Sequence, residues 1–154
     1  LVAEGSTRAR NYKLKNFTEI QLSQTELFPE TENVIWKYRI FPHLKLAQNI
    51  MGICEHGFTE MFNNAIDHSE STVADVMVNQ NYAYIEFYIH DFGVGIFEKI
   101  QKALGLETPQ EALLELSKGK LTTYPEKHAG EGIYFTSRMF DRFTILSGSL
   151  FYSR

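Results

Sequence analysis

Three polar side chains, Glu60, Asn64 and His68, recur at intervals of four residues along a segment with helical periodicity. Because an α-helix turns by about 100° per residue, this spacing places them in one stripe on the helix. The amide oxygen of Asn64 suits Mg²⁺, a cation that keeps most of its waters and bridges substrate phosphates. Glu60, one turn away, could accept a proton from a hydroxyl or water nucleophile. The alternative is that the stripe is the solvated side of the helix.

A second candidate group is Asp91-Phe92-Gly93-Val94-Gly95, which directly follows a predicted strand. The two glycines lack a Cβ, so the backbone there can approach a ligand closely. The carboxylate of Asp91 could accept a hydrogen bond from an exocyclic amine. Taken alone, the same pattern fits an ordinary turn from a strand into a helix.

A third candidate group is Gly130-Glu131-Gly132, which opens the helix predicted for residues 133–141. The unpaired N–H groups and the positive dipole end of a helix N-terminus form a site for phosphate. A plain loop before a helix would have the same composition.

The apolar residues around these groups predict the elements that must hold them in place. Over residues 47–66 they recur in steps of three and four, which predicts a helix ending around residues 69–71. The period changes to two over residues 74–78 and 83–89, which predicts an antiparallel hairpin with one face on a core. Residues 143–152 are expected to form two short strands.

Three further segments complete the expected fold. Residues 34–40 are rich in β-branched and aromatic side chains and precede Pro42, so they predict a strand. Residues 16–33 are polar, contain Pro29 and predict a linker or a loosely packed arm. The insert 97–128 is expected to be partly helical. This order of elements predicts an α+β fold, a two-layer α/β sandwich with a mostly antiparallel sheet and helices on one face.

The composition excludes several classes of protein. The chain has 154 residues, of which 44% are hydrophobic and 14% aromatic, so one domain with a sizeable core is expected rather than disorder. No apolar run approaches the roughly 18 to 20 residues of a membrane span, so no membrane partner is expected. The single cysteine, Cys54, excludes an internal disulfide and is expected to pack in the core. A reducing, cytoplasmic location is the expectation.

The three candidate groups follow one another along the chain in a specific order. Glu-x-x-x-Asn lies on a predicted helix, Asp-x-Gly-x-Gly at the end of a predicted strand, and Gly-x-Gly at the start of a predicted helix. In this order they resemble the GHKL superfamily, named for gyrase B, the ATP-driven chaperones, histidine kinases and MutL-type repair proteins. Residues 60–68 are similar to its N box, residues 91–95 to its first glycine box and residues 130–134 to its second. The resemblance covers residues 34–154.

What the resemblance implies is a histidine-kinase-like domain with an ATP site of the Bergerat type. Asp91 would hold the adenine amino group, and Asn64 would be the ligand of Mg²⁺. His68 would line the nucleotide site, and the second glycine box would face the phosphates. The glycines expected to contact the nucleotide are Gly93, Gly95, Gly130 and Gly132.

The resemblance also implies a mobile ATP lid over residues 96–129. For Lys127 and His128 at its end, two interpretations are open: contact with the γ-phosphate, or a solvated pair. Gly148-Ser149 stands where the family often has Gly-Thr, so the hydroxyl of Ser149 would support Asp91.

Two details indicate the branch of the superfamily. Glu60 stands where the ATPases and the anti-sigma-factor serine kinases carry their general base, and the ending Asn64-Ala-Ile-x-His68 is most similar to the serine kinases. We therefore expect an ATP- and Mg²⁺-binding regulatory domain that transfers phosphate to a protein partner, with Glu60 as its catalytic residue. The alternatives are a non-catalytic ATP-dependent switch in a transcription regulator and a slow ATPase clamp that forms a homodimer. No histidine has the context of a phospho-acceptor, so a self-sufficient histidine kinase is not expected.

The N-terminal residues differ in charge from the rest. Residues 1–15 carry four basic and one acidic side chain, a net charge of +3, whereas the other 139 residues carry eleven basic and eighteen acidic ones, a net charge of −7. Residues 5–14 resemble the wing hairpin of winged-helix DNA-binding domains, whose basic side chains meet phosphates. A basic leader or linker is the alternative. Residues 1–33 are therefore expected to be a basic arm, with DNA as a partner through an upstream domain of a longer protein.

Overall fold

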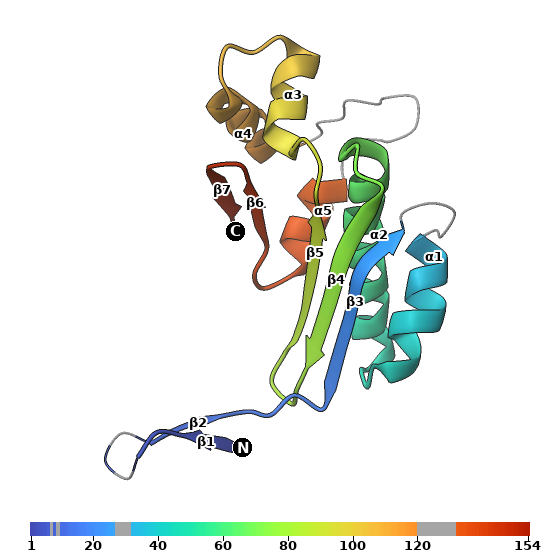
Figure 1. The fold of residues 1–154 in the computed structure, drawn as a ribbon, viewed down its shortest axis with the longest axis vertical. Coiled ribbons are helices and arrows are strands. Elements are labelled where there is room, and N and C mark those ends of the chain that lie inside the picture. The colour runs from blue at the N-terminus through green and yellow to red at the C-terminus, as the bar shows by residue number, and fades with distance from the viewer. Residues whose placement is uncertain (7, 9, 27–31, 120–131) are drawn as a thin grey trace.

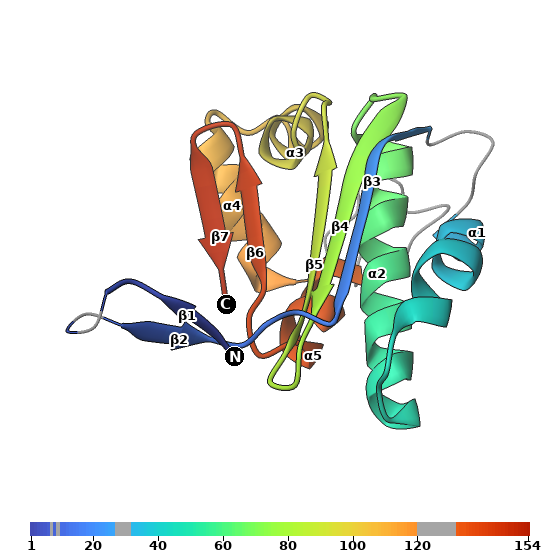
Figure 2. The ribbon, with the colours of Figure 1, turned by 60° about the horizontal axis from the view of Figure 1, so that its bottom comes forward.

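The long helix α2 (Gln48–His68) lies against one face of a three-stranded antiparallel sheet (Figures 1 and 2). Its strands are β3 (Thr18–Glu26), β4 (Val73–Gln80) and β5 (Ile85–Asp91), in the spatial order β3–β4–β5. The structure is a computed structural model that describes residues 1–6, 8, 10–26, 32–119 and 132–154. Helices and antiparallel sheets together make the fold α+β.

The other elements precede and follow this unit. They are β1 (Val2–Glu4), β2 (Asn11–Lys13), α1 (Glu32–Val34), a π-helical segment (Ile35–Ile40), a 3₁₀ turn (Phe41–His43), α3 (Ile96–Leu104), α4 (Pro109–Lys118), α5 (Gly132–Met139), β6 (Thr144–Ser147) and β7 (Leu150–Ser153). The pairs β1–β2 and β6–β7 are each antiparallel hairpins. None of the helices in the described part of the chain has the length and apolar character needed to cross a membrane.

The first hydrophobic core lies between α2 and the sheet, as the helical periodicity predicted. The ring of Phe58 is 1% exposed and packs 5.4 Å from the ring of Phe62 and 5.7 Å from that of Trp36, measured between centroids. Cys54 lies in the same core and is 2% exposed. Burial raises the pKa of the Cys54 thiol to about 11, so the group stays protonated at neutral pH. The prediction that Cys54 packs in the core is confirmed.

The predicted hairpin is confirmed as β4 and β5. Val76 lies opposite Ile89 and Val78 opposite Phe87, so the apolar faces of the two strands meet the same core. The connection is held by the side chain of Asn81, whose oxygen accepts hydrogen bonds from the backbone N–H groups of residues 83 and 84 at 2.9 and 3.1 Å.

The predicted strand over residues 34–40 is wrong, because this segment is helical. Ile35, Trp36 and Ile40 are all buried in the first core. In the wide turn of a π-helix, residues five apart come to the same side, which lets Ile35 and Ile40 share one buried face. Pro42 is the second residue of the 3₁₀ turn that follows, a position where its missing N–H has no cost.

The predicted loose arm over residues 16–33 is wrong for residues 18–26, which form strand β3. Ile20 lies opposite Val78 and Leu22 opposite Val76, and both side chains pack on the first core. Strand β3 thus belongs to the same sheet as β4 and β5. Residues 27–31 lie outside the described part of the chain.

A second hydrophobic core joins the helices α3 and α4 to the hairpin β6–β7. Its buried members are Phe97, Ile100, Ala112 and Leu116, and Ile133, Ile145 and Leu150 pack against them. Between the helices, Gly105 adopts a left-handed conformation, and the hydroxyl of Thr108 accepts a hydrogen bond from the N–H of Glu111. Residues 96–118 of the predicted lid are therefore a packed helical pair, and residues 120–129 lie outside the described residues.

Candidate functional site

The three stripe residues of α2 lie on the edge of the first core, each half-buried. The side-chain N–H of Asn64 donates a hydrogen bond of 2.9 Å to the backbone carbonyl of Glu60. This bond uses one of the two N–H donors of the amide, and the carbonyl oxygen of the amide is an acceptor that the bond does not use. An oxygen on a fixed amide is the kind of ligand that Mg²⁺ accepts.

The segment that follows β5 is tied to the C-terminal end of α2. Asp91 is the last residue of β5, and its carboxylate accepts a hydrogen bond of 3.0 Å from the N–H of Gly93. The N–H of Val94 donates a hydrogen bond of 2.9 Å to the carbonyl of Ser69. A Cβ on Gly93 would overlap that same carbonyl. The sequence predicted a close approach at this glycine, and the structure shows that the neighbour is the protein's own backbone.

Gly95 needs to be glycine for a second reason, because its φ of +81° is one that L-residues rarely adopt. A Cβ here would lie 2.5 Å from the side-chain oxygen of Ser147, at the end of β6. The residue for which a supporting hydroxyl was predicted, Ser149, is exposed in the turn between β6 and β7. The hydroxyl that the structure brings against the glycine segment is therefore that of Ser147. The feature of the sequence that could have indicated Ser147 is its position at the end of a predicted strand.

The third candidate group reaches α2 through Gly132, the first residue of α5. The carboxylate of Glu60 packs directly on this glycine, and a Cβ there would overlap it. The helices also meet one turn earlier on α2, where Gly57 packs on the ring of Phe140. A carboxylate at the N-terminus of a helix interacts favourably with the helix dipole. Glu60 therefore has a structural partner as well as a position from which it could act as a base.

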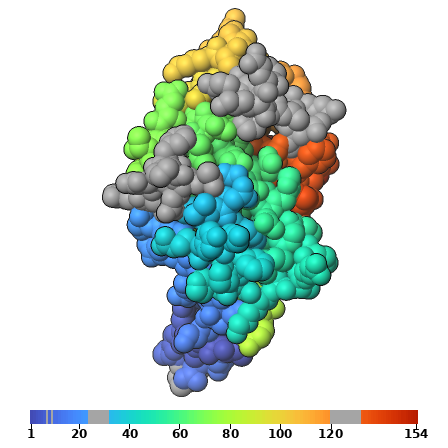
Figure 3. Space-filling view, turned by 90° about the vertical axis from the view of Figure 1, so that its right-hand side faces the viewer, coloured from blue at the N-terminus to red at the C-terminus, as the bar shows by residue number. Residues whose placement is uncertain are grey.

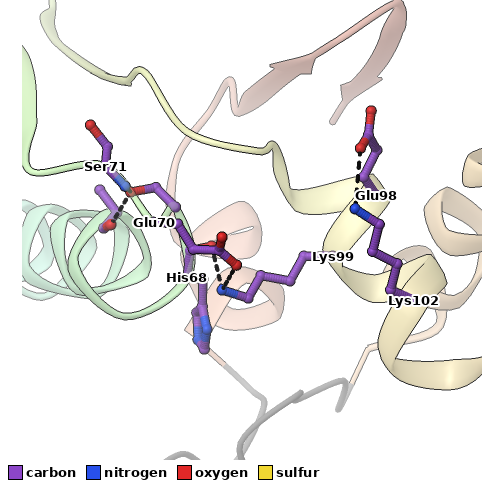
Figure 4. A network of polar contacts seen from close by, with 8 residues as sticks. His68, Glu70, Ser71, Glu98, Lys99 and Lys102 are labelled. Carbon is purple, nitrogen blue, oxygen red and sulfur yellow. Dashed lines mark hydrogen bonds and ion pairs between the residues drawn. The ribbon is translucent and has the colours of Figure 1, made fainter.

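One contact at this site involves a residue that the sequence analysis missed. The ammonium group of Lys99, in α3, donates a hydrogen bond of 2.8 Å to the backbone carbonyl of His68 and pairs with the carboxylate of Glu70 at 3.3 Å (Figure 4). Nothing in the spacing of lysines could have indicated it, since the partner is a backbone atom of a distant helix.

The C-terminal half of α2 is thus the common neighbour of the candidate groups. Gly132 contacts Glu60 and Lys99 contacts the carbonyl of His68, while Gly93 contacts Ser69, the residue after the helix. Gly95 contacts Ser147. His128 and Gly130 lie outside the described residues. Within the described ranges, no three His, Cys, Asp or Glu side chains come together in a way that could hold a metal ion. A cation here would be held by Asn64 together with groups of a bound ligand.

Comparisons of the chain with models of protein families, with curated proteins and with solved structures found no match.

Proposed function

We propose that this chain is an ATP- and Mg²⁺-binding regulatory domain of the GHKL superfamily, with a Bergerat-type two-layer sandwich and protein serine kinase-like phosphotransferase activity. One observation carries the proposal: segments of both glycine boxes pack near the N box, with Gly132 on the carboxylate of Glu60 and Gly93 on the carbonyl of Ser69, the residue that follows α2.

The proposed roles follow from the chemistry of each group. Asp91 accepts a hydrogen bond from the adenine amino group, and Asn64 offers its amide oxygen to Mg²⁺. The N–H groups that open α5 at Gly132 face the phosphates. The bound nucleotide would supply the transferable phosphoryl group. Glu60 accepts the proton of a serine hydroxyl on a partner protein, which raises the nucleophilicity of that oxygen.

The adenine contact is tested by calorimetric titration of ATP, with and without Mg²⁺, into the wild-type chain and its Asp91→Asn variant. Asparagine presents an N–H₂ group to the adenine amine and removes the charge-assisted hydrogen bond, worth about 1.5–3 kcal/mol. We expect the variant to lose about 10- to 100-fold in affinity. Asp141→Asn, at an exposed carboxylate after α5, is the control and should bind as wild type does. A wild-type chain that does not bind ATP would overturn the proposal.

A second candidate is a non-catalytic ATP-dependent switch, favoured by the contact between Glu60 and Gly132. In that case the carboxylate serves to hold α5, and nucleotide binding changes the position of this helix. The switch predicts ATP binding without turnover. A slow ATPase clamp would instead release phosphate at a rate that rises with protein concentration.

We also propose that the N-terminal hairpin β1–β2 contacts DNA. It projects from the body of the molecule (Figures 1 and 3), and all its described residues are exposed. Lys13 forms an ion pair of 2.8 Å with Glu4, and its pKa is raised by that hydrogen bond. Arg8 and Arg10 lie on the loop that joins the strands, where phosphates could reach them.

The expected result for this hairpin is weak, salt-dependent binding of a duplex DNA fragment, measured by fluorescence anisotropy. The double variant Arg8→Ala/Arg10→Ala should lower the slope of log K against log[salt] by about 2. The matched control is Lys37→Ala/Arg39→Ala, which removes two exposed basic residues elsewhere. If the control pair has the same effect as the hairpin pair, the binding is non-specific attraction to positive charge.

A further inference from the structure

Lys99 is more buried than a lysine usually is. Its side chain is 16% exposed, whereas lysines normally keep their ammonium group in water. The ammonium lies between the carbonyl of His68 and the carboxylate of Glu70, both just at the end of α2 (Figure 4). Because Glu70 is 65% exposed on its side chain, the ion pair itself adds little stability. The contact of interest is the one with the His68 carbonyl.

The last carbonyls of a helix have no partner within the helix, and the negative dipole end attracts a cation. In α2, two consecutive carbonyls of this kind are bound by one downstream segment. The carbonyl of His68 accepts from the ammonium of Lys99, and the carbonyl of Ser69 accepts from the N–H of Val94. The chain then leaves the helix through Glu70 with a φ of +63°, a conformation that is uncommon for a residue with a Cβ.

These contacts fix the position of Asp91 from both sides. Before it, β5 is paired with β4, and Asp91 itself lies opposite Ala74. After it, Val94 and Lys99 hold the chain on the end of α2. The carboxylate of Asp91 therefore has a defined place relative to the helix that carries Glu60 and Asn64.

We infer that Lys99 is a positioning residue that sets the selectivity of the site for adenine, acting through Asp91; this inference rests on the proposed function. Without the ammonium, one of the two hydrogen bonds that join the segment after Asp91 to the end of α2 is lost, and the one from Val94 to the carbonyl of Ser69 remains. We expect the segment that follows Asp91 to be held less firmly, so that its carboxylate is less well positioned for a bound adenine amino group. The proposed contacts to the phosphates come from the N-terminus of α5, so we expect them to be kept.

The same helix provides a matched control in Lys102. Lys102 also pairs with a glutamate, Glu98, at 3.7 Å, but its side chain is 73% exposed and the pair lies entirely on the surface of α3 (Figure 4). Removing either ammonium deletes one ion pair and one positive charge from α3. Only removal of Lys99 also deletes a contact with α2.

The experiment compares the affinities of Mg²⁺-ATP and Mg²⁺-GTP for the wild-type chain and for Lys99→Met, Lys99→Arg and Lys102→Met. GTP carries a carbonyl where ATP carries the amino group, so the ratio of the two affinities reports on the Asp91 contact. We expect Lys99→Met to lower the ATP preference at least tenfold, Lys99→Arg to restore most of it, and Lys102→Met to leave it within twofold of wild type. A loss of stability alone would lower both affinities and leave the ratio unchanged.

A wild-type preference for ATP that persists in Lys99→Met would overturn the role of Lys99 while leaving the proposed function intact. A wild-type chain with no preference for ATP would overturn the proposed function and this inference with it. Circular dichroism checks that each variant is folded. If Lys99→Met does not fold, Lys99→Leu replaces it, because its apolar side chain also removes the N–H donor, and an unchanged ratio in that variant is equally contradictory.

Discussion

Replacing Glu60 with glutamine is expected to slow the loss of the γ-phosphate from bound ATP by about 100- to 10,000-fold, the range typical of a general base. Glutamine has the shape of glutamate but cannot accept the proton of the attacking group, which is water when no partner protein is present. Because the shape is kept, the contact with Gly132 and the packing of α5 are preserved. The affinity for ATP should therefore stay within about threefold of wild type. Chromatography of radiolabelled ATP under single-turnover conditions measures the rate, and calorimetry measures the affinity.

Glu55→Gln is the matched control for this experiment. Glu55 lies on the same helix, is exposed, and its substitution removes the same charge. The control should turn over ATP at the wild-type rate. If Glu60→Gln also turned over ATP at the wild-type rate, Glu60 would serve to hold the N-terminus of α5. The result would then favour the non-catalytic switch over the kinase.

The second large effect is expected from Gly93→Ala. The new Cβ would overlap the carbonyl of Ser69, which is backbone and cannot rotate away. Either the hydrogen bond from Val94 to Ser69 breaks or the end of α2 shifts. We expect the free energy of unfolding to fall by about 3 kcal/mol or more, as for other substitutions that force the backbone apart. Urea denaturation followed by circular dichroism measures it.

Gly52→Ala tests whether the loss of stability is specific to position 93 or follows from replacing any glycine. Gly52 lies within α2, and a Cβ there would meet nothing within 4 Å. Alanine in a helix is about 0.5–1 kcal/mol more favourable than glycine, so this variant should be more stable than wild type. Equal stability of Gly93→Ala and wild type would mean that the loop does not touch α2 in solution.

Much of the fold could be predicted from periodicity alone, because α2, β4 and β5 are long and each buries one face. The two errors have physical causes. Residues 34–40 carry side chains that favour strands, and a short apolar run does not distinguish a strand from a buried helix. The alternation of Thr18, Ile20 and Leu22 with polar residues was a strand signal. It was outweighed by the polar composition of the surrounding segment.

The candidate site could be predicted as a set of motifs but not as a set of contacts. Each motif is local, so the stripe on α2 and the glycines could be found by spacing. The partners of these residues are determined by tertiary packing. The contact of Gly93 with Ser69, that of Lys99 with His68 and the place of Ser147 all join segments that are distant in the chain. No local pattern encodes such pairs.

The presence of two hydrophobic cores has a consequence for how this molecule comes apart. Phe58 and Phe62 of α2 are buried in the first core. Ile133, which follows Gly132 in α5, packs against the second. The contact between Glu60 and Gly132 therefore joins a helix of the first core to a helix that packs on the second. The candidate site therefore depends on both cores being intact. If denaturant opened one core before the other, we would expect the site to be lost while amides of the remaining core stay protected from hydrogen exchange.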